Sequence, residues 1–183
     1  FSRMVPALDA ALANVIPDCA LDLIVVNDGS TEAPRERGGI RCGRVSQVWE
    51  IRLRRNLGHQ RAIAVGLHEI ARRWPGSTVV VMDADGEDRP EDVPKLLGMA
   101  MENRGCIILA GRGRRHESMA FLLAYRAYLV IFYFLAGVVP TFGNFSVIPG
   151  ALVSRVVELP EIWMHYSGAL LRSRLPSKIV RCD

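Results

Sequence analysis

The middle of the sequence contains the run Val79-Val80-Val81-Met82-Asp83-Ala84-Asp85-Gly86-Glu87-Asp88-Arg89-Pro90, in which large apolar residues give way to acids. A short apolar run that ends in turn residues is typical of a strand buried on both faces of a parallel sheet. Polar residues follow directly at its carboxyl end, which is where open α/β sheets carry their ligand sites. This stretch therefore predicts an α/β fold and the position of a functional site.

The two aspartates of this run are separated by one residue. In an extended chain, residues i and i+2 point to the same side, so Asp83 and Asp85 face one point in space. Two carboxylates roughly 5 Å apart repel by about 3 kcal/mol at an effective dielectric of about 20, so a cation between them would let both stay ionised. After a turn at Gly86, Glu87 can bring a third oxygen to the same ion.

An all-oxygen donor set favours Mg²⁺ or Mn²⁺ over zinc, so Asp83, Asp85 and Glu87 are the predicted metal ligands. The alternative is an ordinary solvent-exposed loop, since Asp, Gly and Pro are common after any strand.

The composition is that of an ordinary globular domain. The chain has 183 residues, of which 50% are hydrophobic and 23% charged, and we expect one domain over residues 1–183. The net charge of +4 and the arginines between residues 52 and 115 favour an anionic ligand or a membrane surface, and no nucleic-acid partner is expected. The scattered cysteines and the lack of a signal-peptide pattern predict a reduced, cytoplasmic setting.

Strand and helix patterns alternate along the first 110 residues. Apolar residues at helical spacing predict helices over residues 5–15 and 63–74 and a helix beginning at Pro90. Short apolar runs predict strands over residues 21–26, 45–53, 79–82 and 106–110. This alternation predicts a mostly parallel sheet with helices on both faces. Farther along, the patterns predict a strand over 143–149, a helix over 151–159, a helix beginning at Glu161 and a strand over 178–183.

One segment is different in character. Residues 119–139 are almost wholly apolar and rich in aromatic side chains, but Arg126 interrupts them. The uninterrupted part, residues 127–139, is shorter than the roughly 20 residues that a membrane-spanning helix needs. We expect residues 118–139 to form a helical segment at a membrane interface, with burial in the domain core as an equal alternative.

Motifs stand at three of the predicted strand ends. They read Val26-Asn27-Asp28-Gly29-Ser30, then Arg55-Asn56-Leu57-Gly58-His59-Gln60, then Met82-Asp83-Ala84-Asp85. In order and spacing they resemble the motifs V-D-D-G-S-x-D, R-N-x-G-x-x-x-A and M-D-A-D-L-Q-x-P-P-E of family 2 glycosyltransferases of GT-A fold, in particular the dolichol-phosphate mannose synthase-like, polyprenyl-phosphate branch. Asn27, Gly86 and Glu87 depart from the family's aspartate, leucine and glutamine.

The resemblance implies an inverting, metal-dependent transferase that moves a sugar from a UDP- or GDP-sugar to an acceptor such as a polyprenyl phosphate, at the cytoplasmic face of a membrane. Asp85, with the bound Mg²⁺ or Mn²⁺, would be catalytic. The residues implied to bind the nucleotide sugar are Asn27, Asp28, Asn56, Gly58, Gln60, Asp83, Ala84, Arg112 and Arg114. Capping of the following helix is the alternative role for Asn56.

The acceptor determines whether a general base is needed. A lipid phosphate is already anionic and needs none, whereas a hydroxyl acceptor requires a base. The resemblance makes Glu161 the predicted base and His165 a second candidate.

Two departures and two alternatives remain. The family's N-terminal V-x-I-P-x-Y-N-E strand and a C-terminal basic loop or transmembrane helix have no counterpart, so a partial catalytic domain, truncated at both ends, is expected. One alternative is a haloacid-dehalogenase-type phosphatase with Asp83 as nucleophile, although residues 106–115 end in arginines where that fold needs an acidic pair. The other is a non-catalytic nucleotide-binding fragment that acts as a partner at a membrane surface.

Overall fold

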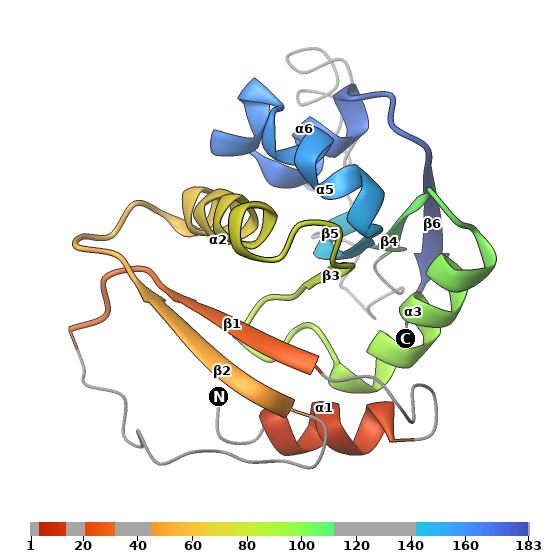
Figure 1. The fold of residues 1–183 in the computed structure, drawn as a ribbon, viewed down its shortest axis with the longest axis horizontal. Helices are drawn as coiled ribbons and strands as arrows, with labels where there is room; N and C mark the ends of the chain where they lie inside the picture. The colour runs from red at the N-terminus through yellow and green to blue at the C-terminus, as the bar shows by residue number, and fades with distance from the viewer. Residues whose placement is uncertain (1–3, 14–20, 32–44, 112–141, 183) are drawn as a thin grey trace, which may run out of the picture.

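The computed structural model describes residues 4–13, 21–31, 45–111 and 142–182 (Figure 1). The predictions for Arg112, Arg114 and the apolar segment 118–139 lie outside the described residues. The helices and strands are α1 (Met4–Leu12), β1 (Leu21–Asn27), β2 (Val45–Arg52), α2 (His59–Arg73), β3 (Val79–Val81), η1 (Pro90–Asp92), α3 (Val93–Glu102), β4 (Ile107–Gly111), β5 (Phe142–Ile148), α5 (Gly150–Val157), η2 (Pro160–Trp163), α6 (Tyr166–Arg172) and β6 (Ser177–Arg181).

The strands form two sheets. β1 and β2 run parallel along their whole length, ending with Asn27 opposite Arg52. The second sheet has the order β3-β5-β4-β6, in which β4 and β6 are parallel. The α/β fold with parallel strand pairs, predicted from the alternating pattern, is confirmed.

β5 adds an antiparallel strand to this arrangement. It runs antiparallel to both β3 and β4, and Phe142 at its start lies opposite Gly111 at the end of β4. The chain therefore re-enters the sheet at the end where it left, which is the geometry of an antiparallel pair. The sequence predicts a strand over residues 143–149, but an apolar run does not indicate whether a strand is parallel or antiparallel to its neighbours.

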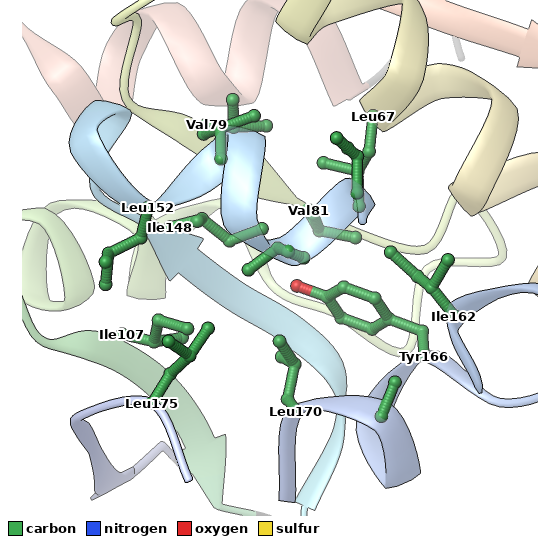
Figure 2. Close-up of a cluster of buried hydrophobic side chains, with 14 of the residues drawn as sticks. Leu67, Val79, Val81, Ile107, Ile148, Leu152, Ile162, Tyr166, Leu170 and Leu175 are labelled. Carbon is green, nitrogen blue, oxygen red and sulfur yellow. The ribbon is translucent and has the colours of Figure 1, made fainter. Parts of the chain in front are cut away.

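The second sheet is covered on both faces. Ile107 and Leu109 belong to one apolar cluster with side chains of α2, α5 and α6, whereas Ile108 and Ala110 belong to another with side chains of α1 and α3. This division follows the alternation of side chains along a strand. Figure 2 shows the first cluster, in which the ring of Tyr166 lies among apolar side chains from several elements.

Two helices begin differently from the prediction. The helix expected from Pro90 starts as the 3₁₀ turn η1 and continues as α3, with prolines in the first turn of each, where a missing N–H costs little. The helix expected from Glu161 is divided into η2 and α6, because the extended backbone of His165 ends one element and caps the next. Across the described residues, none of the helices has the length and apolar character required to cross a bilayer.

Candidate functional site

Asp28 joins the loop after β1 to the loop after β2. Its carboxylate accepts hydrogen bonds from the backbone N–H groups of Leu57, at 2.7 Å, and Gly58, at 2.9 Å. Gly29 permits this close approach, because its φ is +77° and a Cβ there would lie 2.6 Å from the backbone nitrogen of Asn56. Two of the three motifs singled out in the sequence are therefore in contact, and Asp28 organises them.

The asparagines of these motifs close local turns. Asn27 Oδ1 accepts a hydrogen bond from the Ser30 N–H at 2.9 Å, and its Nδ2 donates to Glu50 Oε1 at 3.0 Å. Asn56 Oδ1 accepts from the Gly58 N–H at 3.0 Å. The bonds to Ser30 and Gly58 are the local side-chain bonds that Asn favours in turns. Gly58 is the N-cap of α2 and no side chain caps that helix, so the alternative capping role for Asn56 is wrong.

The start of α2 lies against the end of β3. His59 Nε2 is 3.8 Å from Asp83 Oδ1, and the amide nitrogen of Asn144 is 2.7 Å from His59 Nε2 and 3.2 Å from Asp83 Oδ2. The β3–β5 register explains this contact: Val81 is opposite Ser146, so two residues farther along Asn144 faces Asp83. The segment 55–60 thus touches the Asp28 loop at one end and the Asp83 loop at the other.

Gln60 connects the site to α6. Its Oε1 accepts a hydrogen bond from the Tyr166 N–H at 2.6 Å, and its Nε2 lies 3.4 Å from Asn144 Oδ1. The Tyr166 phenol is fully buried and bonded to Ser146 Oγ at 2.7 Å. Burial raises the pKa of Tyr166, so the phenol stays protonated and serves as a hydrogen-bonding group of the core.

The acidic loop after β3 is exposed and internally bonded. Asp85 Oδ1 accepts from the Glu87 N–H at 2.8 Å, and the Asp83 N–H donates to Asp88 Oδ2 at 2.7 Å. Gly86 turns the backbone with φ +89°. Ala84, Asp85 and Glu87 are all exposed, whereas the side chain of Asp83 is 25% exposed.

The predicted ligand set is not assembled as a cluster of three. Within the part of the chain that the structure describes, no group of three or more His, Cys, Asp or Glu side chains is arranged to hold a metal ion. The donors at this loop fit a different mode: Mg²⁺ commonly binds through one or two carboxylates and completes its shell with water and substrate phosphates. The exposed carboxylate of Asp85 suits that mode, and the three-ligand set stays a prediction.

Glu161 and His165 lie in and after η2. The Glu161 carboxylate is 4.0 Å from Arg172 Nε, and half-exposed. His165 Nδ1 accepts a hydrogen bond from the Gly168 N–H at 3.0 Å, as the N-cap of α6. The bond requires an unprotonated Nδ1, so the structural role of His165 is to cap the helix. The base role of Glu161 stays a prediction.

Sequence reasoning missed several residues of the polar network. Among them are His59, Asp88, Asn144, Ser146, Tyr166 and Ser167. Asn144 carried a signal, because its amide lies within the largely apolar residues 142–148. His59 stood inside a recognised motif, whereas nothing in the sequence distinguishes Ser167 from a surface serine.

Comparison with known proteins identifies the family of this chain. Residues 2–157 match the profile of the family described as Glycosyl transferase family 2. Similar curated proteins are undecaprenyl-phosphate 4-deoxy-4-formamido-L-arabinose transferases from Yersinia enterocolitica (27% identity over 99 residues, 54% of this chain and 29% of the relative), Yersinia pestis (29% over 101 residues, 55% and 29%) and Sodalis glossinidius (30% over 93 residues, 47% and 26%).

The matched part spans less than a third of the length of these relatives. The family profile, by contrast, covers most of this chain and includes the segment 55–60 and the two motifs that it contacts. The family match and the names of these relatives confirm the resemblance to the polyprenyl-phosphate branch, and the chain belongs to glycosyl transferase family 2.

Proposed function

We propose that this chain forms the donor-binding part of an inverting, metal-dependent glycosyltransferase that moves a sugar from a UDP- or GDP-sugar to a polyprenyl phosphate. The observation that carries the proposal is the contact of the segment 55–60 with both Asp28 and Asp83 in a chain of this family. The names of the relatives, which specify undecaprenyl phosphate, support a lipid phosphate as acceptor.

Each part of the site has a proposed task. The loops held by Asp28, with Asn27, Asn56 and Gly58, take the nucleotide. Gln60, Asp83 and Ala84 line the nucleotide sugar, and Asp83, Asp85 and Glu87 hold Mg²⁺ or Mn²⁺. When bound, such an ion neutralises charge on the leaving nucleoside diphosphate.

The reaction exchanges one bond for another at the sugar C1. The bond from C1 to the diphosphate oxygen breaks, an acceptor oxygen bonds to C1 from the opposite face, and the anomeric configuration inverts. A phosphate acceptor attacks as an anion, so no proton has to be removed. Arg112 and Arg114 are proposed to meet the substrate phosphates, and Glu161 would serve as base only for a hydroxyl acceptor. The proposed location is the cytoplasmic face of a membrane, reached through residues 118–139.

Calorimetric titration of UDP- and GDP-sugars, with Mn²⁺ or with EDTA, tests the donor site. We expect one donor class to bind about tenfold or more tightly with Mn²⁺. Asp85→Asn should abolish this metal-dependent gain, whereas Asp92→Asn, the same chemical change in η1, should retain it. Equal binding with Mn²⁺ and EDTA, or no binding of either class, contradicts the proposal.

A second assay separates the alternatives. Transfer of labelled sugar to a polyprenyl phosphate is expected from the transferase, and donor binding without transfer would favour the non-catalytic nucleotide-binding fragment. The family match gives no support to the phosphatase alternative, which would require a phosphorylated Asp83.

A further inference from the structure

We infer that Asn144 is a positioning residue that fixes the orientation of the Asp83 carboxylate, and that Gln60 in turn fixes the orientation of Asn144. The inference rests on the proposed function, in which Asp83 contacts the donor. It concerns residues at three distant positions in the sequence, which β3, β5 and the start of α2 bring together.

Asn144 has the geometry of a residue that orients its neighbour. Its Nδ2 lies 3.2 Å from Asp83 Oδ2 and 3.5 Å from Oδ1, and it is the β5 residue that faces Asp83 across the strand pair. It is 9% exposed, so water competes little for these bonds. Restricting the carboxylate in advance removes a cost that ligand binding would otherwise have to meet.

The direction of the Asn144 amide follows from an unambiguous donor. The backbone N–H of Tyr166 can only donate, so the atom of Gln60 that it contacts at 2.6 Å is the oxygen Oε1. The Gln60 nitrogen therefore faces Asn144 and requires an acceptor, which is Oδ1 at 3.4 Å. Ser167 Oγ lies 3.2 Å from the same Oδ1 and 2.9 Å from the Gly143 carbonyl oxygen, so its single proton has two acceptors and the assignment rests on Gln60.

The Asn144 nitrogen must then point toward Asp83 and His59. It has two protons, one for the carboxylate and one for His59 Nε2 at 2.7 Å, so that ring nitrogen is the acceptor. A neutral amide suits this position because it orients the carboxylate without cancelling its charge. An arginine or lysine there would reduce the negative charge that a metal or sugar hydroxyl group needs.

The test measures whether Asn144 acts through Asp83. The variants are Asn144→Ala, Asp83→Ala, the double variant and Asn103→Ala, an asparagine control whose amide donates to the Met99 carbonyl on α3. UDP and GDP are titrated with Mn²⁺ or EDTA, and unfolding by urea is recorded for each protein. We expect Asn144→Ala to lose about tenfold in the Mn²⁺-dependent gain and less than about twofold in EDTA.

The double variant should bind no more weakly than Asp83→Ala alone, because a residue that acts through Asp83 has no effect without it. Independent effects that add, or an Asn144→Ala affinity equal to that of the wild type, overturn the inference. A merely structural role would lower nucleotide affinity equally with Mn²⁺ and with EDTA.

A spectroscopic measurement keeps the inference separate from the proposed function. If the wild type binds neither nucleotide, the function fails, but the ¹³C shift of the Asp83 carboxyl carbon still reports its hydrogen bonding. We expect this shift to change in Asn144→Ala and in Gln60→Ala but not in Asn103→Ala. An unchanged shift in Asn144→Ala would falsify the positioning role.

Discussion

Replacement of Gly29 by alanine should be among the most damaging single-methyl changes in this domain. Gly29 adopts φ +77°, and its added Cβ would lie 2.6 Å from Asn56 N and 2.8 Å from the carbonyl carbon of Arg55. Both contacts are with backbone, so no side chain can rotate away. The left-handed conformation alone costs an alanine about 1–2 kcal/mol.

The steric clash adds to this cost because it separates the two loops. Separation weakens the bonds from Leu57 and Gly58 to the Asp28 carboxylate, and hydrogen bonds to a charged group are each worth about 1.5–3 kcal/mol. Losing one of them brings the expected loss in the free energy of unfolding to about 2.5–5 kcal/mol. The donor affinity should fall as well, since the loop after β2 is displaced.

Gly105→Ala is the matched control. Gly105 has nearly the same backbone angle, φ +79°, but nothing lies within 4 Å of an added Cβ. It should cost only the conformational term of about 1–2 kcal/mol. Urea unfolding of both variants measures the difference. Equal losses for the two glycines would show that the close approach of the two loops contributes nothing to stability.

Two further outcomes are expected. The Arg72 hydrogen bond, with help from Arg73, lowers the pKa of Glu69 to about 2 from 4.5, so the stabilisation of the fold by ionised Glu69 is complete above about pH 4.5 and is lost as the pH falls toward about 2. The difference in urea midpoint between wild type and Glu69→Gln should shrink over that interval. A constant difference would contradict a stabilising role for this ion pair. Tyr166→Phe removes the hydrogen bond to Ser146 Oγ, but Ser146 Oγ keeps its bond to the Asn144 carbonyl, so urea unfolding should report a loss of about 1 kcal/mol. Donor affinity should stay unchanged, because Gln60 contacts Tyr166 through its backbone N–H and not through the phenol.

The sequence was most informative where one segment determines its own structure. The apolar runs and helical spacings predicted β1, β2, β4 and α2 to within a few residues, because side-chain periodicity reflects local burial. The same local logic identified the loops at Asp28 and Asp83. These are properties of a strand and the turn that follows it.

Features that depend on distant partners were not predictable. Gln60 and Tyr166 are 106 residues apart in the sequence, and Asn144 and Asp83 are 61 apart. No periodicity encodes such pairs, because they arise only when β5 enters beside β3. For the same reason the role of Asp28 in holding the neighbouring loop was not foreseen, although Asp28 itself was selected.

The central position of β5 also affects how the protein is made. Among the described strands, β3 pairs with β5 alone, so residues 79–81 have no sheet partner until residues 142–148 have been synthesised. At about 5–20 residues per second, a ribosome needs roughly 3–13 s to cover that interval. During this time the nascent chain exposes an apolar strand whose ladder groups are unpaired, the kind of surface on which chaperones act. Completion of the site is therefore a late event in the biosynthesis of this domain.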